Sequence, residues 1–210
     1  MIVITVPHAK PHRNVERNEV GMPLTPTPHW CDWIAESAAR LIHDSLPNSV
    51  LLIGDVNRTE FDLNRKESRK TNYRKNLDRV LANSDVKMLI DVHSADDNFF
   101  GDTMITLVEK DIRAWADYQV AAYIQQKAVI RMPKTLAGAN ATLVRNLNNA
   151  GISANIVSAW PTTLDILSQA EEHMTPCVLL EFNEEQFETL ADLKRATDIV
   201  ALWANELNHQ

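Results

Sequence analysis

Short apolar runs of strand length alternate along this chain with longer segments of helical periodicity. The first run, Ile2–Val6, ends at Pro7, and Gly151 closes one of the helical segments. The further strand-like runs are Val50–Ile53, Met88–Val92, Thr103–Val108, Ile152–Val157 and Pro176–Phe182. The helical segments are one beginning near His29, then Arg65–Asn83, Asp111–Ala128, Asn140–Asn149, Thr163–Ala170 and Glu184–Leu207. This alternation predicts an α/β layered sandwich around a largely parallel or mixed sheet.

Length and composition limit the classes of protein to which the chain can belong. Its 210 residues, without a repeat or linker, predict a single domain over residues 1–210. No apolar run is long enough to span a membrane, and the N-terminus lacks the features of a signal peptide. Two isolated cysteines predict no disulfide framework and a reducing, cytoplasmic setting. A net charge of −7 without a basic face argues against nucleic acid as a partner, and the oligomeric state stays open.

Groups able to bind a metal or move a proton follow three of the apolar runs. His8 comes after the first run, His93 after Met88–Val92, and Glu181 at the end of the last. A single histidine after a strand is usually a hydrogen-bonded structural residue. Ligands of open α/β sheets bind beyond the carboxyl ends of the strands, however. The three residues together therefore predict a functional site at that edge.

Two imidazoles and one carboxylate are a common ligand set for catalytic zinc, with one position left for water. The third ligand is expected at the start of the first helix, where Asp32 is preferred and Glu36 is the reserve, although Asp32 also suits a helix N-terminus electrostatically. His12 and Glu16 are further possible ligands in the preceding loop. Glu181 suits the general base that takes the proton from water and gives it to the leaving nitrogen.

The stretch from Asn57 to Arg65 lies between a strand and a helix, at the same expected edge. Arg58 and Arg65, with Asn64 beside the second, offer planar donors for a carboxylate or an oxyanion. Asp62 is interpreted as a buried acid that orients an arginine, and Arg58 alternatively as a surface charge. The cations that continue to Arg79 are either part of this site or a solvated helix face.

In this order, these segments resemble the N-formylglutamate amidohydrolase family, relatives of the zinc carboxypeptidases. That family has Pro-His after a strand, an acid at the first helix, Arg-x-x-x-Asp-Leu-Asn-Arg, Asp-x-His-Ser, and a late glutamate. The matching segments here are Pro7-His8, Asp32-Trp33, Arg58 to Arg65, Asp91-Val92-His93-Ser94 and Leu180-Glu181. The chain departs from the family at Ala9-Lys10, where Ser-Gly is usual, and it has no clear counterpart of the family's Pro-Tyr-x-Gly-Gly segment.

The resemblance implies a three-layer α/β/α sandwich of the zinc carboxypeptidase-like (phosphorylase/hydrolase-like) type. It also implies zinc on His8, His93 and an acid near Asp32. Arg58 would stabilise the oxyanion, Asn64 and Arg65 would hold a substrate carboxylate, and Glu181 would be the general base and acid. The implied reaction is hydrolysis of a C–N amide bond in a small acidic substrate such as N-formylglutamate.

Three other functions stay open. A carboxypeptidase, or a hydrolase of cell-wall or poly-glutamate peptides, would keep the mechanism and change the substrate. An inactive domain that binds small anions would keep only the fold. A phosphate site at the arginines lacks the glycine-rich loop that such sites use, since the chain has only five glycines.

Overall fold

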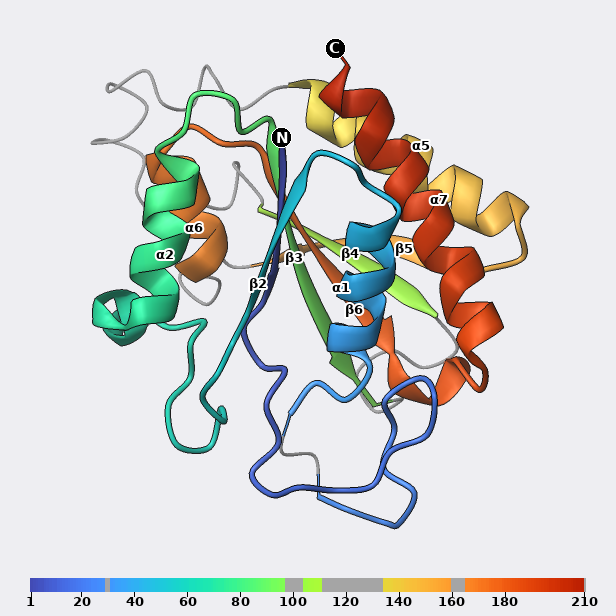
Figure 1. The fold of residues 1–210 in the computed structure, drawn as a ribbon. Coiled ribbons are helices and arrows are strands. Elements are labelled where there is room, and N and C mark those ends of the chain that lie inside the picture. Colours follow the sequence, from blue (N-terminus) through green and yellow to red (C-terminus); the bar gives the residue numbers. More distant parts are fainter. Residues whose placement is uncertain (29–30, 97–103, 111–133, 160–164, 210) are drawn as a thin grey trace.

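A six-stranded mixed sheet forms the centre of the protein (Figure 1). The structure, a computed structural model, describes residues 1–28, 31–96, 104–110, 134–159 and 165–209. The strand order is β2-β1-β3-β6-β4-β5; β1, β2, β3 and β6 run parallel, whereas β4 is antiparallel to β6 and parallel to β5. The strands are β1 (Ile2–Val6), β2 (Ser49–Ile53), β3 (Met88–Ala95), β4 (Ile105–Lys110), β5 (Ala154–Ala159) and β6 (Cys177–Asn183). The predicted mixed, largely parallel sheet is confirmed.

Helices cover both faces of this sheet, as Figure 1 shows. On one face lie α1 (Ala35–Asp44), α5 (Lys134–Asn149) and α7 (Leu190–Asn208); on the other lie α2 (Asn72–Leu81) and α6 (Asp165–Glu172). Alternate side chains of β1 enter two separate apolar clusters: Ile4 packs in the cluster of α1 and α7, and Val3 in that of α2 and α6. Because successive strand side chains point to opposite faces, one strand contributes to both cores. The predicted three-layer α/β/α sandwich is therefore confirmed.

The first helix begins later than its periodicity predicted. Instead of starting near His29, which lies outside the described residues, α1 begins at Ala35. The preceding backbone bonds elsewhere: Asp32 N–H donates to the carbonyl of His8 at 3.0 Å, and Trp33 N–H donates to Glu184 at 2.7 Å. These tertiary bonds hold the segment out of the helix, so Asp32 precedes α1.

Two other predicted helices are interrupted by N-capping threonines. The segment predicted as Arg65–Asn83 is a 3₁₀ helix, η1 (Lys66–Lys70), followed by α2, because Thr71 is extended and its side chain accepts from Arg74 N–H. In the same way, Thr189 separates η5 (Glu184–Gln186) from α7.

The remaining helix predictions have mixed outcomes. The helix predicted from Asn140 begins at Lys134, and Gly151 beyond its end has φ +77°, as predicted for a left-handed terminator. The predicted helix Asp111–Ala128 lies outside the described residues. Within the described part of the chain, no helix is long and apolar enough to cross a membrane, and Cys31 and Cys177 do not form a disulfide.

The cationic cluster is not a solvated helix face at every position. Arg74 is fully buried, where its guanidinium donates to Asp165, Gln169 and the carbonyl of Leu63. Arg69 adds a second pair of bonds to Asp165. The solvated interpretation was therefore wrong for Arg74, which connects α2 to α6 and to the segment before Asn64.

Candidate metal centre

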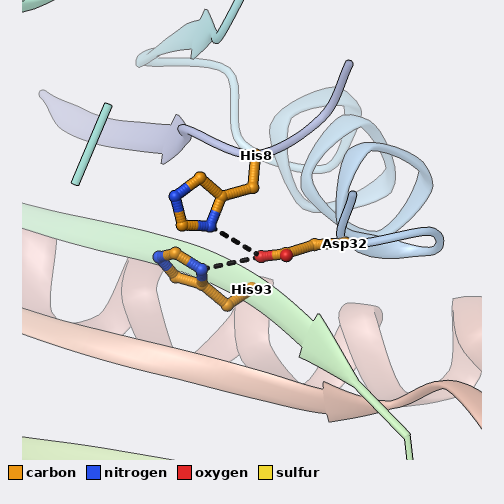
Figure 2. A group of neighbouring side chains, drawn as sticks. All are labelled: His8, Asp32 and His93. Carbon is orange, nitrogen blue, oxygen red and sulfur yellow. Dashed lines mark hydrogen bonds and ion pairs between the residues drawn. The ribbon is translucent and has the colours of Figure 1, made fainter. Parts of the chain in front are cut away.

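Three side chains from distant parts of the chain meet at the carboxyl end of the parallel strands. His8 follows β1, Asp32 precedes α1, and His93 lies on β3; all three are buried. Asp32 Oδ2 is 2.7 Å from His93 Nδ1 and 3.4 Å from His8 Nδ1 (Figure 2). One ligand atom from each residue lies within 4.8 Å of the others. The structure thus brings together the three residues predicted as metal ligands.

The sheet explains why the two histidines come together. β1 and β3 are parallel neighbours in which Thr5 pairs with Asp91, so His93 lies two residues further along β3. β3 continues to Ala95, and His93 is therefore held within the strand and not in a loop after it. The bond from Asp32 N–H to the His8 carbonyl brings the third residue to the same place.

Each imidazole also has a carboxylate partner on its other side. His8 Nε2 lies 2.7 Å from Asp62 Oδ1, and His93 Nε2 lies 3.1 Å from Asp91 Oδ2. Asp91 is held in turn by Thr5 Oγ1, which donates to its other oxygen at 2.7 Å. Histidines that bind metals commonly have such partners, which fix the ring orientation and tautomer.

The environment of His8 Nδ1, the nitrogen that faces Asp32, is the clearest indication of a metal site. His8 Nδ1 is buried and has no hydrogen-bond partner among the described residues, although buried polar atoms are nearly always bonded. A cation between His8, His93 and Asp32 would satisfy this atom. Two imidazole nitrogens and one carboxylate oxygen are donors that zinc accepts, so the residues present fit this ion.

The charges of the three residues are strongly coupled. Burial alone would raise the pKa of Asp32, but the close contacts with His8 and His93 and their positive charge hold it well below its usual range. Burial alone would lower the pKa of His93, yet the carboxylates of Asp91 and Asp32 hold it well above its usual value. In the absence of an ion, a proton on His93 therefore balances the surrounding acids.

Glu181 occupies the neighbouring strand. It lies on β6 as the pairing partner of His93, and it is partly exposed. Burial is the largest cause that raises its pKa to about 7; the charges of Asp32 and Asp91 add to this, and His93 opposes it. A carboxyl group with this pKa can both accept and donate a proton near neutral pH.

The reserve ligands lie elsewhere. Glu36 is on the first turn of α1, where its carboxylate accepts from Arg40 at 2.7 Å. His12 Nδ1 lies 3.6 Å from Glu60 on the surface. Among the described residues, neither belongs to the group of His8, Asp32 and His93.

Arg58 and Arg65 differ in their surroundings. Arg58 Nη1 donates to Asp32 Oδ1 at 2.9 Å, so this residue is part of the site and not a simple surface charge. The Arg65 side chain is half exposed and contacts Asp62 at 3.2 Å. Asp62 does orient an arginine, as predicted, but its shorter contact is with His8.

Asn64 is almost fully buried, and its amide contacts both α6 and His93. Its oxygen accepts from Ile166 N–H at 3.0 Å, and its nitrogen lies 3.3 Å from His93 Nε2. This placement indicates that Asn64 supports His93 and the start of α6. Its predicted contact with a substrate carboxylate stays a prediction.

Two acids of the site were given no role from the sequence, although Asp91 belongs to the Asp-x-His-Ser segment. Asp91 could have been found, because residues two apart on a strand share one face, and it precedes His93 by two. Glu184, which accepts from Trp33 N–H and Ser94, is 151 residues from Trp33 in the sequence. No local pattern indicates such a contact.

The fold is shared with solved structures of low sequence identity. No protein-family model matches the sequence, and no curated protein does either. The crystal structure of gene product Atu2144 from Agrobacterium tumefaciens matches with a TM-score of 0.60 and 11% identity, over 98% of this chain and 89% of that one. At this identity, the match establishes the fold and leaves the family a prediction.

Two more distant matches are amidases by name. The catalytic domain of CwlV, an N-acetylmuramoyl-L-alanine amidase from Bacillus (Paenibacillus) polymyxa var. colistinus, has a TM-score of 0.48 and 15% identity, over 98% of this chain and 96% of that one. The CwlD amidase from Clostridioides difficile, solved in complex with the GerS lipoprotein, has a TM-score of 0.45 and 12% identity, over 96% and 92%. Both are too distant to support an argument about function.

Proposed function

We propose that this protein is a zinc-dependent hydrolase of C–N amide bonds in small, carboxylate-bearing substrates, with N-acyl amino acids such as N-formylglutamate as the substrate class. The proposal rests on one observation: the buried side chains of His8, Asp32 and His93 lie together, and His8 Nδ1 has no hydrogen-bond partner among the described residues. The carboxylates behind both imidazoles support it, because they are the partners that metal-binding histidines use.

The proposed chemistry divides between the ion and the protein. Zinc at such a site lowers the pKa of water and polarises a carbonyl. Glu181, with a pKa of about 7, takes the proton of the attacking water and delivers it to the leaving nitrogen. Arg58, whose side chain is one-third exposed beside Asp32, supplies positive charge for the oxygen of the scissile carbonyl.

Arg65 is the proposed contact for the carboxylate of the substrate. Its side chain is half exposed, and Asp62 already orients it from one side. A half-exposed guanidinium can bind a carboxylate through two parallel hydrogen bonds. A reducing, cytoplasmic setting completes the proposal, in keeping with a sequence that has only two cysteines.

The test compares N-formyl-L-glutamate with short glutamyl and cell-wall peptides, using wild-type protein loaded with zinc and the Glu181→Gln variant. We expect turnover of the N-formyl substrate by wild type, and a loss of at least about 100-fold in kcat with zinc retained in the variant. Hydrolysis of the peptides alone would replace the substrate class and keep the mechanism. Full activity of Glu181→Gln would remove Glu181 from the mechanism, and a zinc-loaded wild type without turnover on any substrate would contradict hydrolysis.

A further inference from the structure

Glu184 is a buried acid outside the group of candidate ligands. It is the first residue of η5, directly after β6, and only 3% of its surface is exposed. A single oxygen, Oε1, accepts two short hydrogen bonds: from Trp33 N–H at 2.7 Å and from Ser94 Oγ at 2.6 Å. Burial of a carboxylate is unfavourable unless it is bonded, and these two bonds compensate part of that cost.

The two donors stand next to two of the three candidate ligands. Trp33 follows Asp32 in the chain, and Ser94 follows His93. Glu184 therefore connects the segment before α1 to β3. In the sequence it lies three residues after Glu181. The bond to Trp33 N–H also helps to keep residue 33 out of α1, which leaves Asp32 directed toward the histidines.

We propose that Glu184 is a positioning residue that sets Asp32 relative to His93 and so preorganises the metal group. This rests on the metal site proposed above. Asp32 and His93 are 61 residues apart in the sequence. Their relative position depends on tertiary bonds, and Glu184 makes bonds to both segments with one atom.

Without the carboxylate, Trp33 N–H and Ser94 Oγ–H lose a shared acceptor inside the protein. Buried donors are rarely left unbonded, so both segments would shift toward other acceptors. Glutamine keeps an oxygen at the same place and can still accept both bonds. Alanine cannot, and the pair of substitutions separates the acceptor from the side-chain volume.

The test measures binding of Co²⁺ and its visible absorption, because this spectrum reports the geometry of the ligands independently of activity. We expect Glu184→Ala to weaken Co²⁺ binding by about 10- to 100-fold and to alter the absorption bands. Glu184→Gln should stay within about threefold of wild type, since it restores the acceptor. Ser94→Ala, which removes one donor and leaves the carboxylate, should give a smaller loss and serves if Glu184→Ala does not fold.

Glu19 provides a matched control. Its Oε1 also accepts from a distant backbone N–H, that of Leu190 at 3.0 Å, and among the described residues it is not part of the metal group. Glu19→Ala should change thermal stability without changing Co²⁺ binding. Equal Co²⁺ affinity and spectra for wild type, Glu184→Ala and Ser94→Ala would overturn the role of Glu184. Failure of wild type itself to bind Co²⁺ would overturn the metal site, and with it this role.

Discussion

Replacement of Asp62 by asparagine removes the negative charge behind His8 while the shape of the side chain is kept. Asp62 Oδ1 lies 2.7 Å from His8 Nε2, and the two side chains are 23% and 5% exposed. Burial would raise the pKa of Asp62, but the bond to His8, helped by Asn64 N–H and Arg65, lowers it from 3.8 to about 2. This change corresponds to roughly 2 kcal/mol in favour of the ionised acid.

The same carboxylate favours zinc binding, because it makes His8 Nδ1 a stronger electron-pair donor to a metal ion. Loss of such a partner typically weakens metal affinity by about 10- to 100-fold, or about 1.4 to 2.7 kcal/mol. We therefore expect Asp62→Asn to raise the Kd for zinc by about 10- to 100-fold. Competition with a chromophoric chelator at neutral pH measures it.

Asp78→Asn is the matched control. Asp78 Oδ1 lies 2.7 Å from His173 Nε2, the same distance, on the exposed surface of α2. This variant should bind zinc with wild-type affinity. An unchanged Kd in Asp62→Asn, or an equal loss in both variants, would refute the reasoning that Asp62 acts through His8.

Two further predictions concern protons. Burial opposes ionisation of Asp165, but its bonds to Arg69 and Arg74 lower its pKa, so its contribution to stability is complete above about pH 4 and is lost as pH falls through the lowered pKa. Asp165→Asn should therefore reduce the free energy of unfolding by about 3–5 kcal/mol at pH 7, with a smaller difference at pH 3; equal differences by urea unfolding would contradict this. Because the pKa of His93 is raised when no ion is bound, zinc binding should release about one proton at pH 7. Calorimetry in buffers of different ionisation enthalpy measures this release, and zinc binding without proton release would contradict the prediction.

The sequence was informative where local pattern and topology coincide. The apolar run Ile2–Val6 is followed by Pro7 and His8, and the run from Met88 leads to His93; parallel pairing of these strands places both histidines at one edge. Asp32 was found for a partly different reason. It was expected at the start of the first helix, whereas the structure holds it before α1: its N–H donates to the His8 carbonyl, and the N–H of Trp33 donates to Glu184.

The remaining features depend on contacts between distant segments. Arg74 has the sequence context of a surface helix, and only its pairing with Asp165 on α6 accounts for its burial. The amide of Asn64 is bonded to Ile166 N–H, 102 residues away, which no spacing rule anticipates. Hydrophobic periodicity reports which face of a segment is buried, but not which polar partners it meets there.

The central claim is that His8, Asp32 and His93 share one metal ion. Crystals grown with zinc, measured on both sides of the zinc absorption edge, test it most directly. We expect one anomalous peak about 2.0–2.2 Å from His8 Nδ1, His93 Nδ1 and an oxygen of Asp32. Two results would contradict this expectation: zinc bound only at other residues, or a His8 Nδ1 that makes a hydrogen bond and has no ion beside it.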